Sequence, residues 1–272
     1  MTSPYVVVGV DGSLAAVRAL DRAAQEAARR EAVLRIVYAV RDRDEAGPVL
    51  GAAVTRVHAC HPELRVESRT AVGGAVAGLV GESRGAVLTV VGSRGLGTVS
   101  GVLARSVGLG LAAQLRGPLL VVRGDHRCDA SRAVLLGLAG DSDAAPAAHA
   151  FEEAERRGVG LEVAHCWAHR FLAPELPSLI PATSPGQRAN ATTGRSEDAV
   201  PRFSLAGLRD RHPGVPVEAR TLRTGPGRTL LAATRDSSVV VIGARHHHGR
   251  LGPVAHTLLR RSHCPVLLVP TP

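Results

Sequence analysis

Two loops carry the residues whose types and spacing could do chemistry, and each places glycine beside charged or hydroxyl side chains. The first is Val8-Gly9-Val10-Asp11-Gly12-Ser13, in which a β-branched run ends at a carboxylate and turns through glycine. The second is Val91-Gly92-Ser93-Arg94-Gly95-Leu96-Gly97, followed by Arg105-Ser106. Glycine lets backbone N–H groups approach a phosphate closely, and arginine and serine can donate further hydrogen bonds to it. The two loops therefore predict a site for a phosphorylated ligand.

Each loop also has a purely structural interpretation. Glycine after a strand is expected in any tight turn into a helix, and Asp11 could serve as the N-cap of the helix that follows it. The residues alone leave both interpretations open.

A third feature, His246-His247-His248, has the side chains of a transition-metal site. Three successive side chains cannot all face one ion without a special turn, and no cysteine or carboxylate lies beside them. We therefore expect no metal here and interpret the segment as a solvated basic loop.

The basic residues narrow the chemistry. The chain has 272 residues, contains no lysine, and carries 33 arginines against 24 acidic residues, for a net charge of +9. The absence of lysine excludes sites that need a P-loop lysine or a Schiff-base lysine. The arginines can bind and position a ligand but do not transfer protons. The positive charge is spread over both halves, and aromatic residues make up only 2%. We therefore predict no sequence-specific binding of nucleic acid.

The compartment is predicted from what the sequence does not show. It has neither a signal-peptide pattern nor an apolar run of membrane-spanning length. Cys60, Cys128, Cys166 and Cys264 lie far apart, which is typical of reduced thiols. We expect a cytoplasmic protein that does not bind a membrane.

The elements that must position the two glycine loops alternate between strand and helix. In the first half we expect strands over 5–10, 34–40, 66–72, 86–91 and 119–122, and helices over 14–30, 75–83 and 101–115. Strands that are apolar on both faces and alternate with helices indicate a doubly wound parallel sheet. Ligands bind such sheets beyond the carboxyl ends of the strands, which is where both loops lie.

The second half repeats the first. Glu26-Ala-Ala-Arg-Arg30 matches Glu153-Ala-Glu-Arg-Arg157 at an offset of 127, 61–70 matches 212–221 at 151, and 118–122 matches 265–269 at 147. The rising offset places an insertion at about 171–200, and the later fall places a deletion of four residues after Arg245. We therefore predict two domains, 1–126 and 127–272.

Together, the Val8–Ser13 loop, Val90-Val91-Gly92-Ser93-Arg94-Gly95, Ser106 and the segment 117–122 resemble the universal stress protein family in its tandem two-domain form. The resemblance covers nearly the whole chain. It implies an α/β fold of two doubly wound five-stranded parallel-sheet domains, strand order 3-2-1-4-5, of the adenine-nucleotide alpha-hydrolase-like kind. It also implies a site that holds ATP or AMP in some members.

Residue by residue, the resemblance gives Asp11 the acidic position and puts Ala39 beside the adenine. Gly92 and Gly95 match the first two signature glycines, but the third falls on arginine, directly before the expected serine. Arg105 either fills the phosphate space or supplies a cation to it, and both remain open. The implied nucleotide-binding residues are Val10, Asp11, Gly12, Ser13, Ala39, Gly92, Ser93, Arg94, Gly95, Arg105 and Ser106.

The second copy departs further from this pattern. Ala139 stands where the first copy has Asp11, although Asp141 follows two positions later. His246 replaces the second glycine, and only Gly252-Pro253 remains of the third glycine and its hydroxyl partner. We expect a degenerate domain that does not hold ATP in the usual way.

The leading hypothesis is a universal stress protein that binds ATP, or AMP or ADP, in its N-terminal domain, with Mg²⁺ accompanying ATP, and acts as a nucleotide-responsive stress regulator. We expect no fast enzyme, because neither glycine loop offers a second carboxylate. The alternatives are a slow ATPase and an interaction scaffold without nucleotide. The apolar fifth strands, 118–122 and 265–269, could pack as an intramolecular pseudo-dimer, and two chains could associate as a homodimer.

Overall fold

The computed structural model describes residues 3–40, 46–93, 107–123, 129–138, 143–166, 205–222, 225–244, 246–247 and 250–271. The first half contains β1 (Tyr5–Val10), α1 (Leu14–Arg29), β2 (Val33–Val40), α2 (Gly47–Cys60), β3 (Val66–Val72), α3 (Ala75–Glu82), β4 (Leu88–Ser93), α4 (Val107–Gln114) and β5 (Leu119–Arg123). Strand and helix alternate through this half, as the sequence predicts. The helix α2 is an addition that the sequence analysis missed.

The second half follows the same plan. It contains β6 (Val134–Leu138), α5 (Ala144–Arg157), β7 (Leu161–Cys166), β8 (Val217–Leu222), α7 (Pro226–Ala233), β9 (Val239–Ala244), β10 (His246–His247), β11 (Arg250–Leu251), α8 (Pro253–Arg261) and β12 (Val266–Pro270). A further helix spans 205–211. The predicted insertion at 171–200 lies outside the described residues.

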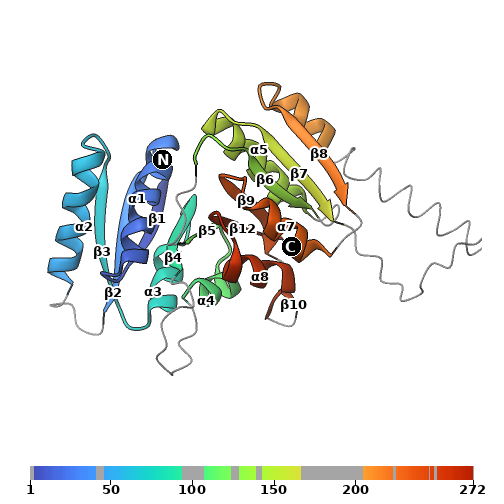
Figure 1. Cartoon of the computed structure of the whole chain (residues 1–272). Helices are drawn as coiled ribbons and strands as arrows, with labels where there is room; N and C mark the ends of the chain where they lie inside the picture. The colour runs from blue at the N-terminus through green and yellow to red at the C-terminus, as the bar shows by residue number, and fades with distance from the viewer. Residues whose placement is uncertain are drawn as a thin grey trace, which may run out of the picture.

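All long strands belong to one ten-stranded sheet with the order β3-β2-β1-β4-β5-β12-β9-β6-β7-β8. Within each half the order is 3-2-1-4-5, which confirms the predicted fold class. Figure 1 shows the blue-to-green half continuing into the yellow-to-red half along this sheet. The halves join where β5 and β12, the two predicted fifth strands, pair antiparallel, with Leu120 opposite Leu267.

Strand register repeats between the halves. Val8 of β1 lies beside Ile36 of β2 and Val90 of β4. Leu136 of β6 lies in the same way beside Val163 of β7 and Val241 of β9. These pairs reproduce the offsets of 127 and 151 found in the sequence. The duplication is therefore one of structure as well as of sequence.

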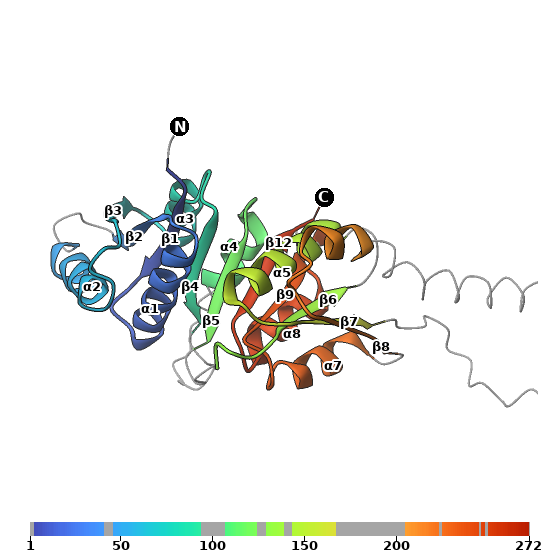
Figure 2. The same ribbon diagram turned by 90° about the horizontal axis from the view of Figure 1, so that it is seen from above.

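Apolar side chains fill both faces of the sheet. One core cluster lies under α1, α2, α5 and the helix over 205–211, and the other lies under α3, α4, α7 and α8. Each cluster contains residues from both halves, and the view from above in Figure 2 shows the two halves adjoining along the sheet. Val, Leu and Ala dominate both clusters, with Phe151 the one aromatic residue in the described core that is fully buried.

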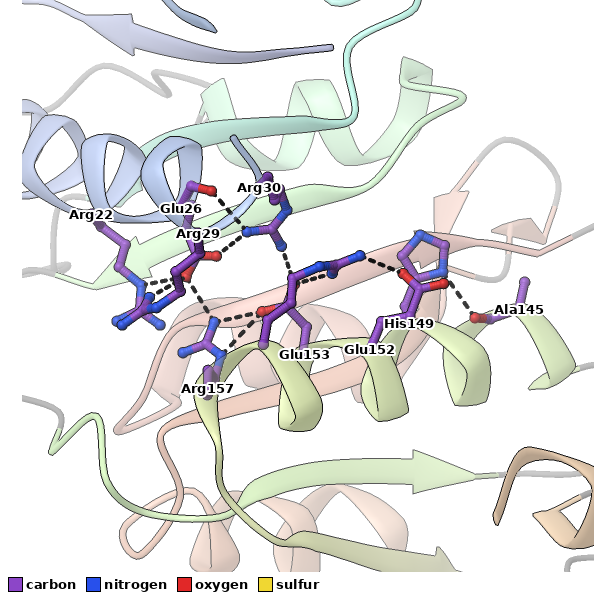
Figure 3. A network of polar contacts seen from close by, with 10 residues as sticks. Arg22, Glu26, Arg29, Arg30, Ala145, His149, Glu152, Glu153 and Arg157 are labelled. Atoms are coloured by element: carbon purple, nitrogen blue, oxygen red, sulfur yellow. Dashed lines mark hydrogen bonds and ion pairs between the residues drawn. The ribbon is translucent and has the colours of Figure 1, made fainter. Parts of the chain in front are cut away.

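On the face covered by α1 and α5, a charged network joins the halves (Figure 3). Arg30, the C-cap residue of α1, bonds to Glu153 of α5, and Arg157 of α5 bonds to Glu26 of α1 at 2.8 Å. Each arginine also contacts the glutamate four residues before it on its own helix. The repeated Glu-x-x-Arg-Arg motif therefore pairs with its own copy. None of the described helices is long and apolar enough to cross a membrane.

Candidate functional site

The first predicted loop forms a compact turn at the carboxyl end of β1. Asp11 Oδ1 accepts hydrogen bonds from the backbone N–H of Ser13 at 3.0 Å and from its hydroxyl at 2.5 Å. Ser13 Oγ in turn accepts from Ala16 N at 3.2 Å and caps α1. The alternative in which Asp11 is the N-cap is therefore wrong: Ser13 caps the helix, and Asp11 orients Ser13.

Gly12 separates these two residues with a φ of +74°, and a β-carbon there would meet nothing within 4 Å. The left-handed backbone conformation therefore explains why position 12 is a glycine, and crowding does not. Asp11 is exposed and Ser13 half-buried. The turn presents a carboxylate, a hydroxyl and the positive end of the 16-residue helix α1 at the edge of the sheet.

The second loop begins beside the first, because β4 pairs with β1. A β-carbon on Gly92 would lie 2.4 Å from the carbonyl oxygen of Ala15 and 2.6 Å from its carbon, so β4 ends in direct contact with the first turn of α1. Ser93 follows, half-buried, as the last residue of β4. This contact gives Gly92 a packing role that holds whether or not a ligand is bound.

Ala39 lies one residue beyond the β1–β2 pairing, near the carboxyl end of β2. It packs towards α3, where a β-carbon on Gly78 would lie 4.0 Å from Ala39 Cβ and only 2.6 Å from Ala71 Cβ. The sequence analysis singled out Ala39 but missed Ala71 and Gly78, the small residues that let α3 approach this edge.

The structure therefore brings six of the eleven predicted residues to the β1–β4 edge: Val10, Asp11, Gly12, Ser13, Gly92 and Ser93. Ala39 lies on the neighbouring strand. The strand order reverses between β1 and β4, which is the switch point at which doubly wound sheets bind ligands. Arg94, Gly95, Arg105 and Ser106 lie outside the described residues.

One protein family matches both halves of the chain. The model of the universal stress protein family matches residues 5–123 and, a second time, residues 131–270. The chain belongs to the universal stress protein family. A universal stress protein of Mycolicibacterium smegmatis is 29% identical over 296 aligned positions. The alignment covers 97% of this chain and 96% of the relative.

Two solved structures are similar to this chain. A universal stress protein from Archaeoglobus fulgidus covers 99% of both chains with a TM-score of 0.64 at 15% identity, which is a likeness of fold. A universal stress protein solved in complex with cAMP is 35% identical, with a TM-score of 0.41, and covers 46% of this chain and all of its own.

The second universal stress domain keeps the frame of the site and changes its side chains. Gly137 matches Gly9: a β-carbon on either glycine would lie 2.9 Å from a leucine of the facing helix, Leu230 in α7 or Leu79 in α3. Ala139 and Asp141 lie outside the described residues. Within the described residues, the strand ends of the two copies thus share the same pairing and the same contact with the facing helix.

Asp143 is the residue of this second site that sequence reasoning missed. It precedes α5 as Ser13 precedes α1, but its side chain is only 3% exposed. A β-carbon on Gly243 would lie 2.9 Å from Asp143 Oδ1. Asp143 is therefore the N-cap residue of α5 by position, with no side-chain capping hydrogen bond, and its buried carboxylate lies close to the end of β9, whereas Asp11 of the first copy is exposed.

The histidine segment also differs from the expectation of a loop. His246 and His247 form the short strand β10, which pairs antiparallel with Arg250–Leu251. Within the described residues, no group of three His, Cys, Asp or Glu side chains is arranged to hold a metal ion.

Proposed function

We propose that this universal stress protein binds ATP, or the related nucleotides AMP and ADP, at the β1–β4 edge of its N-terminal half. The observation that carries the proposal is the junction of the Asp11–Ser13 turn with the Gly92–Ser93 strand end at the switch point of the sheet. Hydroxyl and backbone donors at a helix N-terminus suit phosphate, and the exposed carboxylate suits a ribose hydroxyl.

The residues also fit Mg²⁺ as a companion of ATP. Magnesium in nucleotide sites uses one or two carboxylates together with phosphate oxygens, and Asp11 supplies one carboxylate. In this proposal Arg94, Gly95, Arg105 and Ser106 complete the phosphate site from the loop that follows β4.

We further propose that the two domains, 1–126 and 127–272, form an intramolecular pseudo-dimer in the cytoplasm and that nucleotide occupancy of the first domain sets partner choice in the stress response. The buried Asp143 beside Gly243 supports assigning nucleotide binding to the first domain alone. Association of two chains as a homodimer would then use surfaces other than β5 and β12, which pair with each other.

The test is nucleotide binding by the full chain and by Asp11→Ala. We expect ATP to co-purify or to bind stoichiometrically, and Asp11→Ala to weaken binding by roughly tenfold or more, the order lost with a charge-assisted hydrogen bond. Mass spectrometry of the heat-released nucleotide and calorimetric titration measure both, with AMP and cAMP as further ligands.

Asp129→Ala is the matched control. Asp129 Oδ1 makes the same pair of bonds to Ser131, 3.0 Å to its N–H and 2.6 Å to its hydroxyl, but it precedes β6, away from the carboxyl edge. Its removal should leave binding unchanged. If both variants lose nucleotide binding equally, or if the wild type binds no nucleotide, the alternative of an interaction scaffold without nucleotide remains. Multiple turnovers abolished by Asp11→Ala would establish the ATPase alternative.

A further inference from the structure

The charged network between α1 and α5 holds more positive than negative charge. Within the described residues it comprises the arginines 22, 29, 30, 156 and 157 and the glutamates 26, 152 and 153. Glu26 and Glu153 are almost fully buried, whereas Glu152 is substantially exposed. Five guanidinium groups therefore share two buried carboxylates and one exposed carboxylate.

The excess positive charge lies around Glu26. Its Oε1 lies 2.8 Å from Arg157 Nη2, 3.2 Å from Arg29 Nη1 and 3.1 Å from Arg22 Nε. Its Oε2 contacts Arg30. One carboxylate thus faces four cations, and Figure 3 shows the guanidinium groups of Arg22 and Arg29 on the side of Glu26 away from Glu153 and that of Arg157 in contact with both glutamates.

Two of these guanidinium groups keep buried donors that no described residue accepts. Arg22 Nη2 and Arg157 Nη1 have no hydrogen-bond partner within the described part of the chain, and Arg22 Nε forms an ion pair with Glu26 Oε1 without hydrogen-bond geometry. The Arg157 side chain is 1% exposed and that of Arg22 is 10% exposed. Buried donors of charged groups cost free energy when they lack acceptors, so these N–H groups favour an added acceptor.

Mutual repulsion acts at the same place. Burial, followed by the charge of Arg157, lowers the pKa of Arg22 to about 10 in spite of the charge of Glu26. Two cations are therefore held close together in a poorly solvated environment. A negative charge between them would relieve both the repulsion and the missing hydrogen bonds.

The excess positive charge lies at only one end of the seam between α1 and α5, two helices that correspond to each other in the duplication. At the offset of 127, Glu26, Arg29 and Arg30 correspond to Glu153, Arg156 and Arg157, but Arg22 corresponds to His149. His149 is half-buried, and its Nδ1 lies 3.0 Å from Ala145 O of its own helix. The arrangement around Arg22 therefore has no equivalent at the other end of the seam.

We propose that the α1–α5 seam binds one small inorganic anion between Arg22 Nη2 and Arg157 Nη1, with the partly exposed Arg29 on its solvent side. Bound there, the anion completes the charge balance of the two halves and stabilises their junction. This seam site comprises Arg22, Arg29 and Arg157 and contains none of the residues of the proposed nucleotide site.

The test is thermal unfolding of the full chain at constant ionic strength. Sodium gluconate is exchanged for sodium chloride in one series and for sodium phosphate in another. An anion at ten times its dissociation constant should raise the Tm by roughly 3–6 °C. A rise with chloride alone assigns a monatomic anion, a rise with phosphate alone assigns an oxyanion, and a rise with both salts shows that the site accepts either.

Three variants make the test specific. Arg22→Gln should abolish the rise and, in gluconate, be at least as stable as the wild type, because it removes an uncompensated buried charge. His149→Gln, at the pseudo-symmetric position, should keep the full rise. Asp11→Ala should also keep it, so that phosphate bound at the nucleotide site is distinguished from phosphate bound at the seam.

If Arg22→Gln does not fold, Arg29→Gln is the second variant, since its partly exposed side chain tolerates replacement and its loss should reduce the anion effect. The proposal is overturned if neither anion raises the Tm of the wild type, if Arg22→Gln retains the rise, or if Asp11→Ala removes it.

Discussion

At the scale of single residues, a family motif and a packing requirement coincide at Gly92. The β-carbon that any other residue would add lies 2.4 Å from the Ala15 carbonyl oxygen, which is closer than non-bonded atoms approach. The glycine therefore lets β4 end against α1, and that contact also fixes where the segment after β4 begins. In the second copy, a β-carbon on Gly243 would lie 2.9 Å from Asp143 Oδ1 and 2.9 Å from Thr271 Cγ2.

Gly92→Ala should destabilise the fold by roughly 2 kcal/mol or more, because α1 or β4 must shift to accept the methyl group. Chemical unfolding measures the loss. Gly51→Ala is the control: it lies in α2 with nothing within 4 Å of the added β-carbon, and it should gain about 0.5–1 kcal/mol. Equal effects of the two substitutions would contradict the packing role of Gly92.

Ser13→Ala tests the cap of α1. The substitution removes the acceptor for Ala16 N and the donor to Asp11, so we expect a loss of about 1 kcal/mol in the free energy of unfolding. Ser131→Ala removes the same side-chain bond to an aspartate where no helix follows, and should cost less. A smaller loss for Ser13→Ala than for Ser131→Ala would mean that the cap contributes nothing.

The positions of site residues could be predicted where they depend only on the strand that precedes them in the chain. Asp11 and Gly12 follow β1, Gly92 lies near the end of β4, and the apolar runs of both strands are plain in the sequence; these residues lie at one edge of the sheet because β1 pairs with β4. Asp143 could not be predicted, because α5 starts seven residues after Gly137 whereas α1 starts five after Gly9. That difference moves a carboxylate from an exposed turn to a buried cap.

At the scale of elements, the repeated Glu-x-x-Arg-Arg motif shows how much the sequence could say. It revealed the duplication, but not that the two copies contact each other. That contact depends on the antiparallel pairing of β5 with β12, which brings α1 and α5 together. The helix α2 escaped prediction for another reason: it begins at Gly47-Pro48 and buries only Leu50, Ala53 and Val57.

The seam makes stability depend on acid pH. Burial alone would raise the pKa of Glu26, but the charges of Arg157, Arg22 and Arg30 and a hydrogen bond from Arg30 lower it from 4.5 to about 2. A carboxylate with a lowered folded-state pKa stabilises the fold above pH 4.5 and loses that contribution as the pH falls towards 2.

We therefore expect Glu26 to contribute roughly 3 kcal/mol at neutral pH, of which about 2 kcal/mol is lost by pH 3. Urea unfolding between pH 6 and pH 3 measures this. Glu26→Gln should be less stable at pH 6 and show a shallower pH dependence, whereas Glu152→Gln, which removes an exposed partner of Arg156, should retain the wild-type dependence. Parallel curves for the wild type and Glu26→Gln would contradict the assignment.

At the scale of the whole molecule, the two halves share more than a linker. Their sheets continue through β5 and β12, and both core clusters contain side chains from each half. Apolar fifth strands in both copies predicted where the halves meet, because such strands remain exposed unless something covers them. The charged seam, by contrast, required the three-dimensional arrangement of helices that neighbour each other only across the junction.

A shared core predicts that the two halves unfold together. Scanning calorimetry of the wild type should give one transition whose calorimetric and van't Hoff enthalpies agree. Leu267→Asp should divide it into two, because Leu267 lies opposite Leu120 at the junction, is 2% exposed, and would bury an unpaired charge there. Val72→Asp, on the edge strand β3 with 60% of the side chain exposed, should preserve the single transition. Two transitions in the wild type would show that sheet continuity does not couple the halves, and nucleotide bound to the first half would then have no route through the core to the second.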